Sequence, residues 1–103
     1  MSEESYTLVR DLESGDIVRL DFRWNMSKNK IVDFTINVSL IDGENMMEVY
    51  RIDTKHGYPH EHRFWKEQKP KRLDMDYSKL FMEKKEEVLE NYHKWIALFK
   101  QNR

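Results

Sequence analysis

Apolar and polar residues alternate along the first half of the chain, which is the pattern of β-strands. From Ile17 to Trp24 every second residue is apolar, beginning with Val18, and most of the residues between them are charged. From Ile31 to Leu40 the alternation is stronger, because the intervening positions are Asp, Thr, Asn and Ser. Successive side chains point to opposite faces of a strand, so each segment predicts a strand with one buried and one solvated face.

Three further segments extend this pattern into a sheet. Residues 6–12 are weakly strand-like, residues 46–53 form a strand whose faces are less cleanly separated, and residues 60–65 return to alternation. The connections carry turn residues, of which Asp42-Gly43 is the strongest hairpin signal. Short connections between successive strands favour an antiparallel meander.

The period changes after Pro70, where apolar residues recur at helical spacing from Tyr77 to Phe99. This spacing predicts a helix of about 23 residues, roughly 35 Å long. Asp76 or Ser78 is expected to cap its start. We therefore expect an α+β fold, an antiparallel sheet meander of four or five strands with one long C-terminal helix packed on one face. The opposite face of the sheet is polar and needs no second layer.

Composition narrows the class of protein. A chain of 103 residues with 39% hydrophobic and 13% aromatic residues suits a single domain spanning residues 1–103. The absence of cysteine excludes disulfides, thiolate metal sites and cysteine nucleophiles, and it favours a reducing, cytoplasmic location. The chain contains no run of about eighteen apolar residues, so no membrane span is predicted. The acidic N-terminus is unlike a signal peptide. The oligomeric state is left open by the sequence.

Candidate chemistry is concentrated between Arg51 and Trp65, in the segment RIDTKHGYPHEHRFW. Three of the four histidines of the chain fall here, at positions 56, 60 and 62. Residues 51–72 contain seven Lys or Arg against three Asp or Glu, although the formal net charge of the chain is only -1. A local basic surplus beside the histidines predicts an anionic partner.

The motif R-x-D-x-x-H-G-x-x-H-x-H, which spans residues 51–62, resembles the signature of small uncharacterised prokaryotic domains of about this length. It is also similar to the TumE-like toxin components of toxin–antitoxin pairs, which have a comparable segment between strands, followed by a terminal helix. The resemblance implies a cytoplasmic domain that acts on RNA, with a small antitoxin-like protein as a further partner. It also places the aspartate and the three histidines of the motif at the active site.

A metal-independent ribonuclease is the first chemical hypothesis. Cleavage of RNA through its own 2′-hydroxyl needs a base, an acid and positive charge near the phosphate, and histidine suits both proton-transfer roles because its ordinary pKa lies close to neutrality. The candidate catalytic residues are His56, His60, His62, Asp53 and Arg51. In this hypothesis the aspartate orients a ring, and Arg51, Arg63 or Lys55 stabilises the phosphorane. The candidate RNA-binding residues are Lys55, Tyr58, Arg63 and Trp65.

Two other interpretations of the same segment stay open. In the first, the histidines bind a metal ion, with the aspartate as a possible further ligand. In the second, the protein is a non-enzymatic binding module, and Arg51 and Arg63 pair with Asp53 and Glu61 in a cross-strand network. No cofactor is predicted, because three isolated glycines cannot build a phosphate-binding loop.

Overall fold

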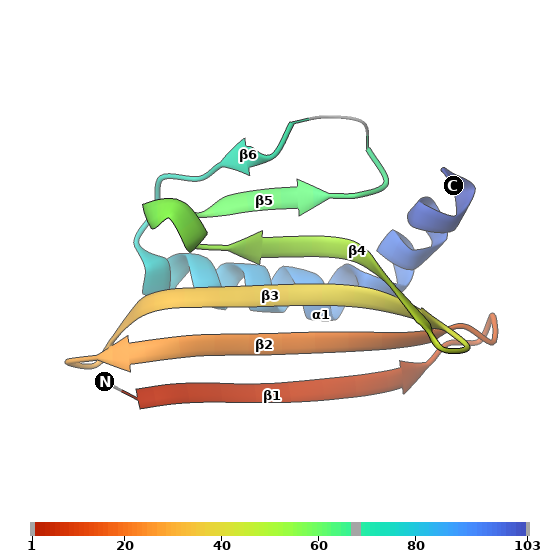
Figure 1. The fold of residues 1–103 in the computed structure, drawn as a ribbon, viewed down its shortest axis with the longest axis horizontal. Helices are drawn as coiled ribbons and strands as arrows, with labels where there is room; N and C mark the ends of the chain where they lie inside the picture. Colours follow the sequence, from red (N-terminus) through yellow and green to blue (C-terminus); the bar gives the residue numbers. More distant parts are fainter. Residues whose placement is uncertain (1, 67–68, 103) are drawn as a thin grey trace.

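The computed structural model describes residues 2–66 and 69–102, and these form an antiparallel sheet of six strands with one long helix across one face (Figure 1). The strands are neighbours in the sheet in the order in which they occur in the chain. They are β1 (Ser2–Asp11), β2 (Ile17–Ser27), β3 (Lys30–Asp42), β4 (Asn45–Asp53), β5 (His60–Arg63) and β6 (Lys71–Arg72). A short 3-10 turn, η1 (Lys55–Gly57), joins β4 to β5, and α1 (Tyr77–Gln101) is the helix.

The α+β class and the meander are confirmed, but the expected number of strands, four or five, is too low for the described residues, which form six. The missed strand is β6, whose two residues, Lys71 and Arg72, pair with Glu61 and His60. Two charged residues show no alternation, so the hydrophobic pattern does not reveal them. The first strand also begins earlier than residue 6, at Ser2, because its polar N-terminal half pairs with β2.

The alternating residues of the central strands build the core against the helix. Leu20 and Phe22 of β2, with Phe34 and Ile36 of β3, are all at most 2% exposed. The helix adds the buried residues Leu80, Phe81, Val88, Trp95 and Ile96. Each fully buried apolar side chain contributes about 1.5–3 kcal/mol. The contact between sheet and helix is therefore the main source of stability.

A β-bulge in β4 explains why its sequence pattern is blurred. Tyr50 lies opposite Val38, and the register shifts just beyond this pair, so that Val49 is an extra residue in β4. Val49 and Tyr50 are consecutive and both fully buried, which strict alternation does not allow. The bulge leaves Tyr50 on the helix side of the sheet, where its ring stacks on Trp95 with centroids 4.5 Å apart.

The helix begins where the sequence predicts. The Asp76 carboxylate accepts a hydrogen bond from the backbone N–H of Lys79 at 3.0 Å, which is the geometry of an N-cap. Ser78, the other expected cap, instead accepts a hydrogen bond from the backbone N–H of Ile31 at 3.0 Å and so joins the helix start to β3. In the part of the chain that the structure describes, no helix has the length and apolar character needed to cross a membrane.

Replacing Asp76 with alanine is expected to lower the free energy of unfolding by about 1 kcal/mol, because a free N–H at the helix start loses its acceptor. Urea denaturation followed by circular dichroism measures this change. Asp76→Asn is the matched control, since asparagine caps helices about as well as aspartate. Equal losses in the two variants would contradict a capping role for the side chain.

Candidate functional site

The turn between β4 and β5 brings the histidines to one side of the sheet. The Thr54 hydroxyl accepts a hydrogen bond from the Phe34 N–H at 3.0 Å, and the Thr54 N–H donates to the Phe34 carbonyl at 3.2 Å. These bonds fix the end of β4 on β3. The chain then reverses through His56 and Gly57, whose φ angles are 59° and 82°. A positive φ is unfavourable for histidine and costs glycine nothing, so the surrounding contacts maintain this reversal.

Five rings lie in a row along the face of β5 that points away from the helix. The ring centroids of His56 and His60 are 5.7 Å apart, and those of His60 and His62 are 5.3 Å apart. Phe64 continues the row with its centroid 5.5 Å from His62, and Tyr58 lies 5.6 Å from His60. We call these five residues the β5 ring row. The predicted sharing of one strand face by His60 and His62 is part of this arrangement.

Asp53 fixes the orientation of His60. The Asp53 side chain is only 7% exposed, with one oxygen 3.1 Å from His60 Nε2 and the other 3.1 Å from Arg51 Nε. The backbone N–H of Lys55 donates to the same carboxylate at 3.1 Å. His60 Nδ1 lies 3.3 Å from the carbonyl oxygen of Tyr58. Both ring nitrogens of His60 therefore face oxygen acceptors, which holds the ring in place and leaves neither nitrogen free to take a proton from a substrate.

His62 has a different environment. Burial, together with the charge of Arg51, lowers the pKa of the His62 imidazole below its ordinary value of 6.5, so the ring is neutral at pH 7. Its Nε2 atom is buried and has no hydrogen-bond partner among the described residues. Asn37 Oδ1, in the same cross-strand row of the sheet, is also without one. Buried polar atoms without a partner are uncommon in folded proteins.

Arg51 is paired with carboxylates on both sides. Its Nη1 donates to the two oxygens of Glu48 at 2.8 and 3.0 Å, in addition to the ion pair with Asp53. The predicted pairing of Arg51 with Asp53 is thus confirmed. The guanidinium also lies over the Phe64 ring, 5.7 Å from its centroid. Its charge is largely compensated within the protein, and its planar face contacts one end of the ring row.

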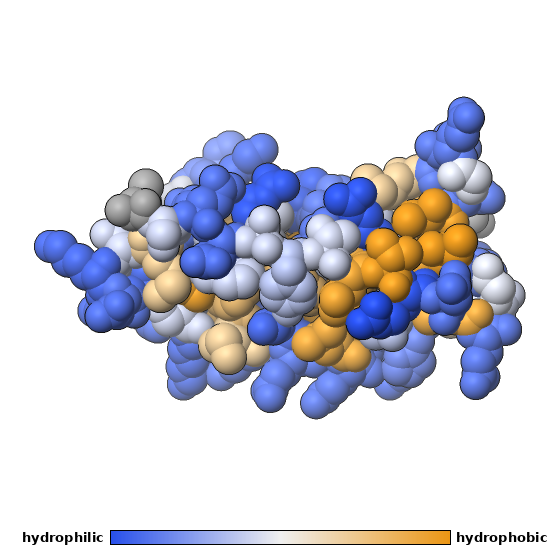
Figure 2. All heavy atoms as spheres, turned by 90° about the horizontal axis from the view of Figure 1, so that it is seen from below, coloured by the Kyte–Doolittle hydropathy of each residue, from blue (hydrophilic) through white to orange (hydrophobic). Residues whose placement is uncertain are grey.

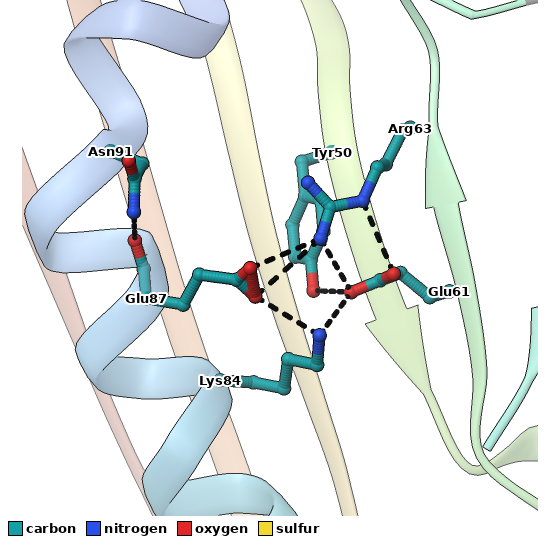
Figure 3. A network of polar contacts seen from close by, with 6 residues as sticks. All are labelled: Tyr50, Glu61, Arg63, Lys84, Glu87 and Asn91. Carbon is teal, nitrogen blue, oxygen red and sulfur yellow. Dashed lines mark hydrogen bonds and ion pairs between the residues drawn. The ribbon is translucent and has the colours of Figure 1, made fainter.

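The helix side of β5 contains a network of buried polar contacts (Figure 3). The Glu61 carboxylate accepts hydrogen bonds from the Tyr50 hydroxyl at 2.6 Å and from Arg63 Nε at 3.2 Å, and it lies 2.8 Å from Lys84 Nζ. Arg63 and Lys84 both reach Glu87, at 3.1 and 3.0 Å. We call these five residues the Glu61 network. It joins β4, β5 and α1, and it includes the predicted pair of Arg63 with Glu61.

The donors of the network keep Glu61 ionised. Burial by itself raises the pKa of a carboxyl group, but the hydrogen bonds from Lys84 and Tyr50 and the charge of Arg63 outweigh it, so the pKa of Glu61 lies below its ordinary value of 4.5. Burial and the charge of Glu61 raise the pKa of the Tyr50 hydroxyl, which therefore remains a donor. A buried carboxylate of this kind is stable only while its partners are present.

Two of the predicted binding residues lie on this helix side and not with the histidines. The Arg63 guanidinium packs over the rings of Tyr50 and Trp95, 5.5 and 5.1 Å from their centroids. Trp65 is 8% exposed and stacks on Trp95 with centroids 5.4 Å apart. The structure therefore does not bring Arg63 or Trp65 to the ring row, and the buried Trp65 ring is not available to stack on a base.

Of the other predicted binding residues, Tyr58 is a member of the ring row and Lys55 directly precedes His56 in the chain. The structure adds Arg72. Arg72 lies opposite His60 in the β5–β6 pair, and its guanidinium packs over the Tyr58 ring at 4.4 Å from the centroid. The only sequence signal for Arg72 was its place in the basic segment. Its position beside His60 depends on the pairing of a two-residue strand, which the hydrophobic pattern does not encode.

The histidines do not form a metal site. Among the described residues, no three His, Asp or Glu side chains are placed so that they could bind one metal ion. The imidazoles run in a row along β5 and do not converge on a point, while Asp53 is occupied by His60 and Arg51. The metal-binding interpretation therefore has no support in this geometry.

Comparison with known proteins places the whole chain in one family. A family model described as a domain of unknown function, DUF7718, matches residues 1–103. The chain belongs to this family. No curated protein and no solved structure matches the chain. Membership of DUF7718 agrees with the predicted resemblance to small uncharacterised domains. The family description specifies no activity, so the similarity to TumE-like toxins stays a prediction.

Glu61→Gln is expected to lower the free energy of unfolding at neutral pH by about 1–3 kcal/mol, because the network loses its charged acceptor. The pKa of Glu61 is lower in the folded protein than in the unfolded chain. Its stabilisation is therefore present above about pH 4.5 and is lost as the pH falls through the folded-state pKa. The difference between the two proteins should shrink over that range, as measured by urea denaturation at successive pH values.

Glu83→Gln is the matched control, because Glu83 is an exposed residue of α1, the helix that supplies Lys84 and Glu87 to the network. It should change stability little at any pH. A difference between Glu61→Gln and the unaltered protein that stays constant from neutral pH to well below pH 4.5 would show that the Glu61 charge does not stabilise the fold.

Proposed function

We propose that this DUF7718 protein is a binding module for single-stranded RNA and that the β5 ring row is its contact surface. The ring row is the observation that supports the proposal. Each ring centroid lies 5.3 to 5.7 Å from that of a neighbouring ring, with Arg72 packed on Tyr58 and Arg51 packed on Phe64. Modules that bind single-stranded RNA stack unpaired bases on aromatic rings and guanidinium planes, often on the open face of a sheet.

The edge of the sheet beside the ring row is basic, which suits a phosphate backbone. Lys55, Lys69, Lys71 and Arg72 are all exposed. Among the residues that the structure describes, the acidic partner of Arg72 is Asp74, and both of these side chains are more than half exposed, at 62% and 78%. Surface ion pairs of this kind contribute little to stability, so a phosphate can compete with Asp74 for the Arg72 guanidinium. Binding should therefore weaken as salt is raised.

The placement of His60 favours binding over catalysis. A general base needs a free nitrogen lone pair within reach of the substrate hydroxyl. Both nitrogens of His60 are directed at protein oxygens, those of Asp53 and Tyr58. The ring is thus held in a fixed orientation, where it supports the more exposed rings of the row, those of His56 and Phe64.

Ribonuclease activity of the TumE-like kind is a second candidate, and the environment of His62 favours it. A neutral imidazole at pH 7 is able to accept the proton of a ribose 2′-hydroxyl. The 2′-oxygen would then attack the phosphorus and the 5′-oxygen would leave with a proton supplied by the exposed His56. The products would be a 2′,3′-cyclic phosphate and a free 5′-hydroxyl. A small antitoxin-like protein belongs to this second candidate as its partner.

Phe64→Ala is expected to weaken binding of a single-stranded oligouridylate about tenfold, because one stacking contact contributes roughly 1–3 kcal/mol. Fluorescence anisotropy with a labelled oligonucleotide at fixed salt measures the affinity. Met82→Ala is the matched control, since Met82 is an apolar side chain of α1 that is 57% exposed, against 40% for Phe64. The proposal fails if no RNA binds at low salt, or if the two variants bind equally well.

If His62 is a general base, the purified protein cleaves single-stranded RNA, and His62→Gln slows cleavage by about a hundredfold or more. Electrophoresis of a 5′-labelled RNA follows the reaction, with mass spectrometry of the product end. His93→Gln is the control, because His93 is an exposed histidine on α1. RNA that remains intact with the unaltered protein removes the ribonuclease candidate and leaves the binding proposal standing.

A further inference from the structure

A hollow of about 690 Å³ lies between the β1–β2 turn and the C-terminal turns of α1. Figure 2 views the molecule from the β1 edge and shows apolar side chains gathered at the end where, in Figure 1, this turn and the end of the helix lie. None of the residues that line the hollow belongs to the β5 ring row or to the Glu61 network. Clefts of roughly 300–1,000 Å³ have the size that holds a small organic molecule.

Most of the surface inside the hollow is apolar. The helix contributes one of its faces, because residues 93, 96, 97 and 100 are spaced three and four apart. Ile96 is 1% exposed and belongs to the core, and Leu12 packs against the core from the turn. Ala97 lies on the same helix face and has no side-chain atom beyond Cβ, which leaves the space beside the turn open. The apolar body of a ligand would be removed from water here.

The turn that forms one wall of the hollow is fixed by its own hydrogen bonds. The Leu12 N–H donates to the Asp16 carbonyl at 2.8 Å, and the Gly15 N–H donates to the Leu12 carbonyl at 2.9 Å. The Ser14 hydroxyl donates to the Asp16 carboxylate at 2.7 Å. The same carboxylate accepts from Lys100 Nζ at 2.8 and 3.1 Å, which joins the turn to the helix. A wall that is ordered in advance loses little conformational entropy when a ligand binds.

The charged groups around the hollow favour a cation. Its lining includes three carboxylates, those of Asp11, Glu13 and Asp16, and two basic side chains, those of Lys100 and His93. Asp16 and Lys100 compensate each other in an ion pair. Among the residues that the structure describes, Asp11 and Glu13 form no ion pair. The lining therefore keeps a net negative charge whether or not His93 is protonated, and uncompensated charge beside an apolar wall attracts ions of the opposite sign.

We infer that the hollow binds a small organic cation, with the apolar body of the ligand against Leu12 and Ala97 and its positive group beside Asp11 and Glu13. The basic residues next to the lining in the chain, at positions 10 and 94, do not line the hollow. An anion of the same shape would meet the two uncompensated carboxylates and would find the Lys100 ammonium already paired. This binding site is additional to the surface proposed for RNA.

Two probes of matched shape and opposite charge test the inference. 4-Phenylbutylamine and 4-phenylbutyrate have the same phenyl body and the same number of carbon atoms, and at neutral pH the first is a cation and the second an anion. Each is titrated into 15N-labelled protein and followed by NMR. The amine should shift the resonances of residues 11–16 and 93–100 and saturate them. It should bind about tenfold more tightly than the acid, because attraction of the amine and repulsion of the acid both contribute.

Variants separate the charge of the site from its shape. The double variant D11N/E13Q removes the two uncompensated charges and should bring the affinities for the two probes close together. The double variant E83Q/E86Q is its control, because it makes the same change in net charge at exposed positions in the N-terminal half of α1 and should keep the preference for the amine. Ala97→Phe places a ring where the ligand would lie and should weaken binding of the amine about tenfold or more. Circular dichroism confirms that every variant is folded.

Several results would overturn the inference. These are the absence of saturable shifts with the amine, equal binding of the two probes by the unaltered protein, D11N/E13Q that keeps the preference of its control, and Ala97→Phe that binds the amine normally. Resonances of residues 11–16 that move with protein concentration when no probe is present would also overturn it, because a second copy would then occupy the hollow. None of these outcomes depends on RNA binding, since the ring row lies on β5 and the turn before it.

Discussion

The position of β5 depends on the buried carboxylate of Glu61. Placing an uncompensated carboxylate in a protein interior costs several kcal/mol, and Glu61 is only 6% exposed. Its donors come from three elements: Tyr50 from β4, Arg63 from β5 itself and Lys84 from α1. Because β5 is only four residues long, its pairing with β4 provides few backbone hydrogen bonds. The Glu61 network supplies the additional contact that holds β5 against the helix.

Fixing one face of β5 determines what its other face can do. Alternate residues of a strand point in opposite directions, so directing Glu61 and Arg63 toward α1 directs His60 and His62 to the opposite face of the sheet. Asp53 then holds His60 at a defined angle, and the rings of His56, Tyr58 and His62 contact it at 5.3 to 5.7 Å between centroids. A surface ordered before binding loses little conformational entropy when a ligand arrives. The buried ion pairs on one face and the ring row on the other are therefore two consequences of the same short strand.

The sequence predicts those parts of the fold that follow from periodicity. The alternation in β2 and β3 and the helical spacing after Pro70 identified the sheet, the helix and the face between them. Alternation also grouped His60 with His62, and Glu61 with Arg63, but it did not indicate which pair meets the helix. One clue was present in Lys84, a basic residue at a helix position where an apolar residue is expected. In the structure Lys84 forms a buried ion pair with Glu61, which lies on the facing strand β5.

What the sequence did not reveal depends on register and local irregularity. The bulge at Val49 shifts the pairing of β4 by one residue and moves Tyr50 into the core, which no composition signal marks. The strand β6 has no hydrophobic pattern, so Arg72 could not be placed beside Tyr58.

The proposed role of the ring row is tested most directly by NMR titration of 15N-labelled protein with a single-stranded oligoribonucleotide. Resonances of residues 55–64 and of Arg72 should shift together and saturate, while those of β1 and β2 stay in place. Unchanged spectra, or shifts confined to β1, β2 or α1, would contradict the proposed role.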